Sequence, residues 1–303
     1  MQPGILRYIA RRIVFAGLLI FCSSSAAFLL ARIVPGDYFT DLQLDPAYVA
    51  AERARLGLDR PLPQQYGDWL AGGLRLDFGE SLKFGRPVGD LIRERAGNTL
   101  VLGASALILA TLIGIPLGVV SGTRRRSAIG SFAKVTSLVL LSVPPLITSL
   151  VVLLIAVRTG WFAIGAGHPL LPSLALALPI AAVLERLQSQ AIAATLDDPA
   201  VLAAFARGIP PRRVIWRHCL RLSLKPVLAI YGVIVGGVLS GSFVVEVVMA
   251  WPGLGHLMQQ ALLSRDFYLI SGCAAVGSVF LALGILLSDL ALLAVDPRLG
   301  EAA

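Results

Sequence analysis

The residue types that most often carry catalysis or metal binding are few in this sequence, and they do not cluster. No HExxH or GxSxG motif occurs, so the sequence offers no zinc-peptidase or serine-hydrolase site. It also lacks the GxxxxGK[ST] phosphate loop, so we do not expect this chain to bind ATP. The cysteines show no CxxC spacing and the histidines are scattered: Cys22, Cys219, Cys273, His168, His218 and His256. We therefore expect no catalytic residues, no metal site and no cofactor bound by this chain.

The most informative polar stretch is 197–226, which interrupts a very apolar second half. Asp198 suits an N-cap and Pro199 the first helical turn, so a helix is predicted from there to Arg207, with Gly208 as its exit. Pro210 and Pro211 then restart the chain for a second short helix. In that helix three arginines recur at i, i+4 and i+8, which places them on one face: Arg213, Arg217 and Arg221. A basic cytoplasmic loop that only orients the protein is the alternative reading.

Composition defines the class of protein. The chain has 303 residues, of which 56% are hydrophobic and only 15% charged. Its mean hydropathy is +0.80. A soluble domain of this size needs far more polar surface, so we predict an all-α polytopic membrane protein. The net charge of +8 comes from short basic clusters beside apolar runs, which are typical of orientation signals and of contacts with anionic lipid rather than of nucleic-acid binding.

The apolar runs predict six membrane-spanning helices in a single domain over residues 1–303. The basic start could belong to a cleaved signal peptide, but the first apolar run is too long for a typical signal core, so we expect it to stay as a span. The basic triplet 124–126 and the tail 296–298 then fall on the cytoplasmic side, as do both termini. The expected spans are 13–34, 99–122, 132–157, 170–187, 227–249 and 271–295.

The segment between the first two spans, 35–98, is predicted to be an extracytoplasmic insert. Its stretch LGLDRPLPQQYGDWL indicates a short amphipathic helix after a proline-marked turn. The aromatic residues Tyr66, Trp69 and Phe78 could pack a small external subdomain or lie at the membrane surface, and the sequence does not separate these possibilities.

Two further features could belong to a transport path. Near the middle of the third predicted span, Ser142, Pro144 and Pro145 indicate a kink that could line a path or serve packing alone. After the fifth span, a turn fixed by glycine and proline precedes an amphipathic stretch, which could form an outer gate or a simple interfacial connector. The residues of this candidate gate are Trp251, Pro252, Gly253 and Gly255.

A secondary transporter that needs no ATPase is an alternative function, but it would require charges inside the membrane. The charged residues of the apolar regions lie at or near predicted span ends, where snorkelling and interfacial pairing explain them more simply: Glu185, Arg186, Glu246 and Asp289. An intramembrane enzyme is a third alternative, for which no group of residues is a candidate.

Taken in order, these motifs resemble the permease subunits of bacterial ABC importers for dipeptides, oligopeptides and nickel, in their B-type branch. The resemblance covers nearly the whole chain and rests on the ordered motifs Pro35-Gly36-Asp37, LGLDRPLPQQY, DFGESL, GIPLG, ARGIPPRRVIWRHCLRLSLKP, WPGLGHLMQQALLSRDFYLI and Asp296-Pro297-Arg298.

The resemblance implies a type I ABC importer permease fold in the bacterial inner membrane and a function that depends on partners. Those partners would be a second, homologous permease subunit, two cytoplasmic ATPases that bind ATP-Mg, and an extracytoplasmic substrate-binding protein. It also implies that the 197–226 loop couples the permease to an ATPase. The implied coupling residues are Ala200, Leu202, Ala203, Ala204, Phe205, Arg207, Gly208, Arg212 and Arg213.

The coupling segment departs from the family pattern. Positions that are usually Tyr, Arg, Thr and Arg are here Ala200, Leu202, Ala203 and Phe205, whereas Ala204, Ala206 and Gly208 match. This more apolar surface indicates docking through packing rather than ion pairs, with Ala204 expected at the docking surface. Peptides are the expected substrates, and nickel chelates, glutathione or another small solute remain alternatives.

Overall fold

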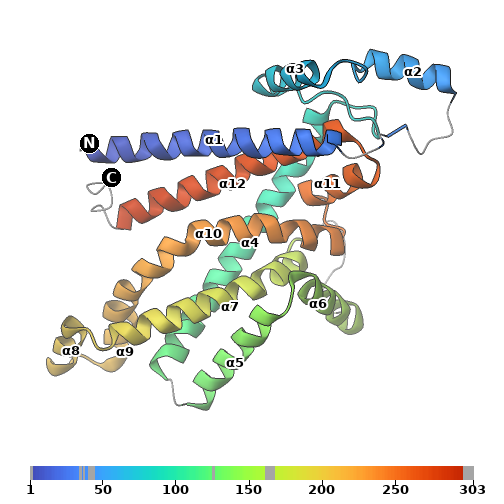
Figure 1. Cartoon of the computed structure of the whole chain (residues 1–303). Coiled ribbons are helices and arrows are strands. Elements are labelled where there is room, and N and C mark those ends of the chain that lie inside the picture. Colours follow the sequence, from blue (N-terminus) through green and yellow to red (C-terminus); the bar gives the residue numbers. More distant parts are fainter. Residues whose placement is uncertain are drawn as a thin grey trace. The chain divides into compact units, whose positions relative to one another are not determined.

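The computed structural model describes residues 3–33, 36, 38–39, 45–124, 127–160 and 168–295, for the backbone alone at 3–6, 239–241, 291–292 and 294–295. Pro35, Asp37, the Arg125–Arg126 pair and the 296–298 tail lie outside the described residues. The regular secondary structure of the described part is helical, apart from one isolated bridge between Glu80 and Pro87 (Figure 1). Its helices are α1 (Pro3–Ile33), α2 (Pro46–Arg55), α3 (Leu62–Leu74), α4 (Val88–Thr123), α5 (Ala128–Ser142), α6 (Pro145–Thr159), α7 (Leu170–Thr195), α8 (Pro199–Ala206), α9 (Pro211–Arg213), the π-helical η1 (Val214–Cys219), α10 (Leu220–Val248), α11 (Leu254–Leu263) and α12 (Phe267–Val295).

Five helical segments in the described part are long and apolar enough to cross a membrane, and a bent pair, α5 with α6, would make a sixth. The five coincide with predicted spans, although several start earlier or end later than expected. They are Arg7–Ile33, Val88–Thr123, Leu170–Thr195, Pro211–Val248 and Phe267–Leu290.

The expected kink in the third span is instead a complete break. Helices α5 and α6 meet at 112°. Val143, which precedes the two prolines, is extended at φ −95° and ψ 124°, because a residue before proline avoids the helical region. Pro144 then serves as the N-cap of α6, whose first residue is Pro145. Two consecutive residues without a backbone N–H therefore end one helix and start another.

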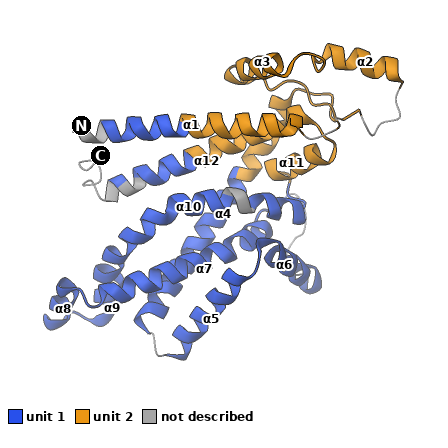
Figure 2. Ribbon diagram, in the orientation of Figure 1, with its two compact units in different colours: residues 1–16, 100–251, 283–303 blue, residues 17–99, 252–282 orange. Residues whose placement is uncertain are grey.

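The chain divides into two compact units (Figure 2). The first comprises residues 1–16, 100–251 and 283–303, and the second comprises residues 17–99 and 252–282. Each unit has its own buried core.

In the first unit, three glycines let α4 lie directly against α7. A Cβ added at Gly114 would lie 2.6 Å from the carbonyl oxygen of Ala181, and one at Gly122 would lie 2.6 Å from that of Ser189. Gly118, between them, faces Gln188 equally closely. Small residues at such spacing allow backbones in membranes to approach and gain packing. These glycines therefore bring α4 into direct backbone contact with α7.

Polar side chains are buried beside this glycine contact. The Ser121 hydroxyl donates a hydrogen bond to the carboxylate of Glu185, and Gln188 Nε2 donates to Ser223 Oγ at 2.7 Å. The sequence-based placement of Glu185 at the inner end of a span is wrong, because α7 continues to Thr195. Glu185 is only 2% exposed, so a hydrogen bond inside the protein, and not snorkelling, accounts for it. Asp289, in contrast, forms a 3.2 Å ion pair with Arg12, which agrees with the pairing expected for it near a span end.

In the second unit, α3 packs its aromatic side chains against α1. The rings of Trp69 and Phe28 lie 4.9 Å apart, and Tyr66 shares a 2.7 Å hydrogen bond with Ser25. Trp69 is 7% exposed, so its ring is packed inside the second unit instead of lying exposed at a surface. The predicted helix after the proline-marked turn is α3, whereas α2 was not predicted.

The helix of the second span starts earlier than its apolar run. It begins at Val88 rather than near Thr99, so the end of the predicted insert is already helical. Val88, Leu91 and Ile92 form a buried cluster with residues of α11 and the start of α12. Because Asp90, Arg93 and Glu94 interrupt the hydrophobic run, hydropathy alone places the start too late.

Asp266, which precedes α12, connects that helix to the 81–83 loop of the insert. Its carboxylate accepts hydrogen bonds from Ser81 Oγ at 2.6 Å, from Lys83 N at 3.1 Å and from Leu269 N at 3.2 Å. Burial raises the pKa of this carboxyl above its ordinary value of 3.8, although these hydrogen bonds oppose the shift.

This shift predicts a pH-dependent stability. A pKa that is higher in the folded than in the unfolded protein means that the folded state binds the proton more tightly. The carboxyl group therefore contributes most to the free energy of unfolding at a pH below its ordinary pKa. This contribution is lost as the pH rises through the raised pKa. In detergent, the melting temperature of the wild type relative to Asp266→Asn should therefore fall over the pH range that begins at about 4, the ordinary pKa of the carboxyl group. A difference that is constant across this range would contradict the prediction.

Candidate functional site

The candidate site is built on α8, the short helix between the fourth and fifth predicted spans. Asp198 caps it, because its Oδ1 accepts a hydrogen bond of 2.8 Å from Ala200 N. Pro199 occupies the first turn, where its missing N–H costs nothing. The helix runs to Ala206 with Arg207 as C-cap, which confirms the helix predicted from the sequence and shortens it by one residue.

Gly208 ends this helix in the left-handed conformation that the sequence predicted. Its φ is +74°, its N–H donates to Phe205 O at 2.9 Å, and the N–H of Ile209 donates to Ala204 O at 3.3 Å. These two bonds form a Schellman motif, which satisfies the last carbonyl groups of the helix. A Cβ at position 208 would meet nothing within 4 Å, so the requirement for glycine here is one of backbone conformation alone.

The inner side of α8 belongs to the core of its own unit. Val201 is fully buried and Ala204 is 6% exposed. Both pack in a cluster that includes Val119, Ile192 and Val214. The expectation that Ala204 lies on an exposed docking surface is therefore wrong, because its side chain is buried within this chain. A charge placed there would disrupt this packing.

The outer side of α8 is exposed and mostly apolar. Leu202 is 53% exposed and Phe205 is 36% exposed. We call this surface the α8 outer face; its residues are Ala200, Leu202, Ala203, Phe205, Ala206 and Arg207, all exposed. A rigid helix that buries one side and exposes large apolar residues on the other has the form of a docking element.

The second predicted short helix is not separate. After Pro210, the chain is helical from Pro211 to Val248, and Pro226 lies inside α10 rather than at a boundary. Residues 214–219 form a π-helical segment, in which buried Val214 and Cys219 are five residues apart instead of the four of an α-helix. This wider turn keeps both buried, and periodicity in the sequence does not reveal it.

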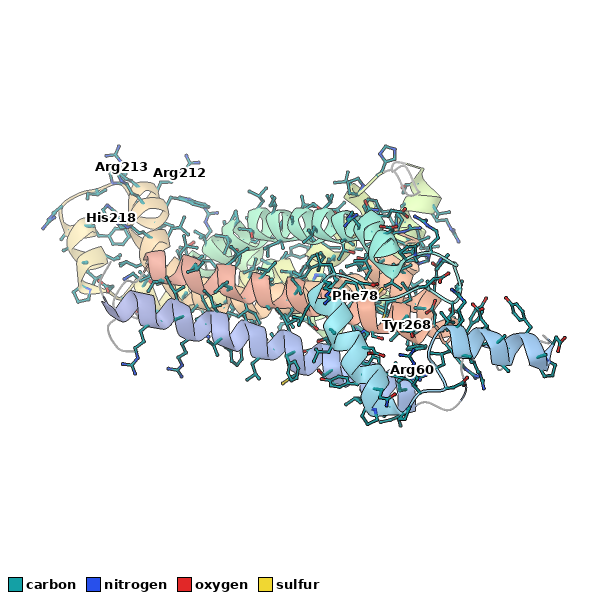
Figure 3. All side chains as sticks on the ribbon, turned by 90° about the horizontal axis from the view of Figure 1, so that it is seen from above. Arg60, Phe78, Arg212, Arg213, His218 and Tyr268 are labelled. Carbon is teal, nitrogen blue, oxygen red and sulfur yellow. The ribbon has the colours of Figure 1, made fainter. Side chains whose placement is uncertain are left out.

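Basic side chains surround the start of this long helix. Arg212 and Arg213 are exposed, as is His218, and the two arginines project outward in Figure 3. The predicted arginines at 213, 217 and 221 are all exposed as well. Together with the α8 outer face, they form an exposed apolar surface with cationic neighbours.

The other predicted site residues lie elsewhere. Ser142, Pro144 and Pro145 are exposed at the break between α5 and α6. In the first unit, Trp251 is 5% exposed and packs in the core, so it is not a surface anchor. In the second unit, Gly253 is the N-cap of α11 and Gly255 is already within that helix, so the predicted turn is shorter than expected. Among the described residues, no group of three or more His, Cys, Asp or Glu could hold a metal ion.

Comparisons with known proteins define the class. Residues 114–301 match the family described as binding-protein-dependent transport system inner membrane component, and residues 5–102 match the N-terminal part of such membrane components. The chain therefore belongs to the family of inner membrane permeases of binding-protein-dependent ABC transport systems. Members of this family are multi-pass transport components and not enzymes.

Individual relatives are similar over almost their full length. The chain is 32% identical to the oligopeptide transport system permease protein AppB of Bacillus subtilis, with 96% of this chain and 98% of the relative covered. It is 29% identical to the dipeptide permease DppB of Lactococcus lactis, with 96% and 98% covered. It is also 29% identical to the glutathione permease GsiC of Escherichia coli K12, with 97% and 99% covered.

Proposed function

We propose that this chain forms half of the translocation path of an ATP-driven importer of di- and oligopeptides in the bacterial inner membrane. The observation that carries the proposal is the similarity, over almost the full length, to relatives named as oligopeptide and dipeptide permeases. The partners would be a second, homologous permease subunit, two cytoplasmic ATPases that bind ATP-Mg, and an extracytoplasmic substrate-binding protein. The fold would be that of a type I importer permease with six spans, α5 and α6 together making one.

In this proposal the α8 outer face docks on an ATPase. A fixed helix transmits motion only if it cannot rotate freely, and α8 is held by its Asp198 cap, its Gly208 exit and the buried Val201. The exposed Leu202 and Phe205 would be covered by the partner, and the arginines at 212 and 213 would contact its acidic groups. The residues at the α5–α6 break would line the path, and those around Gly253 would form the outer gate.

Uptake by a reconstituted system tests the proposal. Proteoliposomes with both permeases, both ATPases and the binding protein should accumulate a labelled tripeptide only when ATP is supplied to the ATPases. Glutathione is a second candidate substrate, favoured by the similarity to the glutathione permease, and competition with unlabelled glutathione measures it. Equal uptake without the ATPases would instead indicate a secondary transporter.

The proposed topology predicts which side of the membrane each segment faces. In a cysteine-free background, Asp68→Cys should react with a membrane-impermeant maleimide added to cells whose inner membrane is intact and whose outer layers let the reagent through. Arg212→Cys should react only after the inner membrane is opened, because the basic cluster is expected inside. Reaction of Arg212→Cys from outside would contradict an extracytoplasmic 35–98 insert and cytoplasmic termini.

A further inference from the structure

The second unit contains a cavity that the proposed transport function does not use. Its volume is about 270 Å³, and its walls come from the α2–α3 turn, from α3, from the 77–79 segment and from Tyr268 of α12. All of these residues lie within the second unit, and of them only Tyr268 belongs to a candidate membrane span. Figure 3 shows Arg60, Phe78 and Tyr268 at the same end of this unit.

The walls combine aromatic rings with charges of both signs. Trp69, Phe78 and Tyr268 supply the aromatic surface, and the charged lining residues are Arg55, Arg60, Asp68 and Asp77. Converging charged and polar groups beside aromatic rings can fix the orientation of a small solute. Pockets for drug-sized ligands begin at roughly 300 Å³, so this cavity suits a smaller molecule.

The cavity is held in place by hydrogen bonds that cross between segments. The Tyr268 hydroxyl donates to Leu56 O at 2.8 Å. Gln65 Nε2 donates to Leu58 O at 3.0 Å and to Arg60 O at 2.6 Å, which fixes the turn that carries Arg60. The Gly79 N–H donates to Asp77 Oδ1 at 3.0 Å. The lining residues are therefore positioned before any ligand arrives.

The guanidinium group of Arg60, at this cavity, can donate further hydrogen bonds. Arg60 uses one guanidinium nitrogen, Nη1, in a 3.1 Å ion pair with Asp68, and a guanidinium carries five N–H donors. Trp69 Nε1 is buried, and among the described residues it has no hydrogen-bond acceptor. Because that nitrogen is buried, Trp69 offers the cavity its ring and not its N–H.

We propose that this cavity is a binding site for a small zwitterion with an apolar side chain, of the size of an amino acid or a dipeptide. Its carboxylate is bound by the N–H donors of Arg60 that the ion pair with Asp68 does not use. Its ammonium group is bound on the side of Asp68 and Asp77, and its side chain contacts the rings of Phe78 and Tyr268. This goes beyond the proposed function, because the site lies in the insert and its occupation requires neither ATP nor partners.

Calorimetric titration of the purified full-length chain in detergent with the dipeptide leucyl-leucine tests the site. The wild type should bind, and Arg60→Gln should bind at least about tenfold more weakly, because a charge-assisted pair is lost. Arg75→Gln is the matched control, since Arg75 is exposed at the end of α3 and does not line the cavity.

The ligand itself supplies the second arm of the test. Leucyl-leucine amide lacks the carboxylate, so it should bind the wild type as weakly as leucyl-leucine binds Arg60→Gln, and Arg60→Gln should not weaken it further. Arg60 is largely exposed, so this variant should keep the wild-type melting temperature. Absence of dipeptide binding by the wild type, or equal binding by Arg60→Gln and Arg75→Gln, would overturn the proposal. Neither result would bear on ATP-driven uptake, which is measured separately.

Discussion

Gly118→Leu is expected to leave little folded protein in the membrane. A Cβ at this position would lie 2.6 Å from Gln188 Cβ and 2.7 Å from the backbone oxygen of Glu185. Because one of these atoms is backbone, a change of rotamer cannot relieve the contact, and α4 must move away from α7. That movement also breaks the hydrogen bond from Ser121 to the buried carboxylate of Glu185. We expect a loss of about 3 kcal/mol or more.

The measurement is the amount of protein in the membrane fraction, together with the melting temperature in detergent. Gly97→Leu is the matched control, because Gly97 lies in the same helix, is exposed, and has nothing within 4 Å of its added Cβ. This control should accumulate normally, since leucine is also a better helix former than glycine. Equal levels of the two variants would show that the α4–α7 contact does not hold the first unit together.

The sequence predicted the features of this fold that depend on local chemistry. Long apolar runs predict where helices cross a membrane, and the N-cap at Asp198 and the left-handed exit at Gly208 follow from the preferences of single residues. The pair Pro144–Pro145 was correctly recognised as an interruption, but its consequence was underestimated. How far a proline pair turns the chain depends on what each helix packs against, and the sequence does not contain that information.

The features that were missed depend on contacts between distant segments. Glu185 was placed near a surface because its partner, Ser121, lies in another helix. Nothing in the sequence distinguishes Ala204 from its exposed neighbours, because its burial depends on the packing of α8 against Val119 and Ile192. The π-helical turn that follows α8 is likewise not visible in the sequence. The cavity in the insert likewise joins the 55–79 segment to Tyr268, and no spacing pattern connects residues so far apart.

Gly208→Val is expected to abolish transport while the protein still reaches the membrane. Valine in the left-handed region costs about 1–2 kcal/mol or more, because its branched Cβ crowds the carbonyl group. The chain can avoid this cost only if residue 208 changes its φ from +74°. That change breaks the two hydrogen bonds of the Schellman motif and alters the direction in which the chain leaves α8. Position 208 lies outside the candidate spans and has free space around it, so insertion should be unaffected. Peptide uptake, ATPase co-purification and membrane level are the three measurements.

Two further variants separate a misdirected helix from a blocked surface. Gly208→Asn should retain most transport, because asparagine tolerates the left-handed conformation, and equal loss in Asn and Val variants would contradict the backbone argument. Leu202→Glu leaves the backbone intact but places a charge on the exposed α8 outer face, so it should prevent ATPase binding through desolvation of an unpaired carboxylate. Leu74→Glu, at a residue that is 85% exposed in the insert, is its control and should bind the ATPase normally. Normal uptake by Leu202→Glu would mean that the ATPase does not contact this face, and α8 would then be a connector held by its caps.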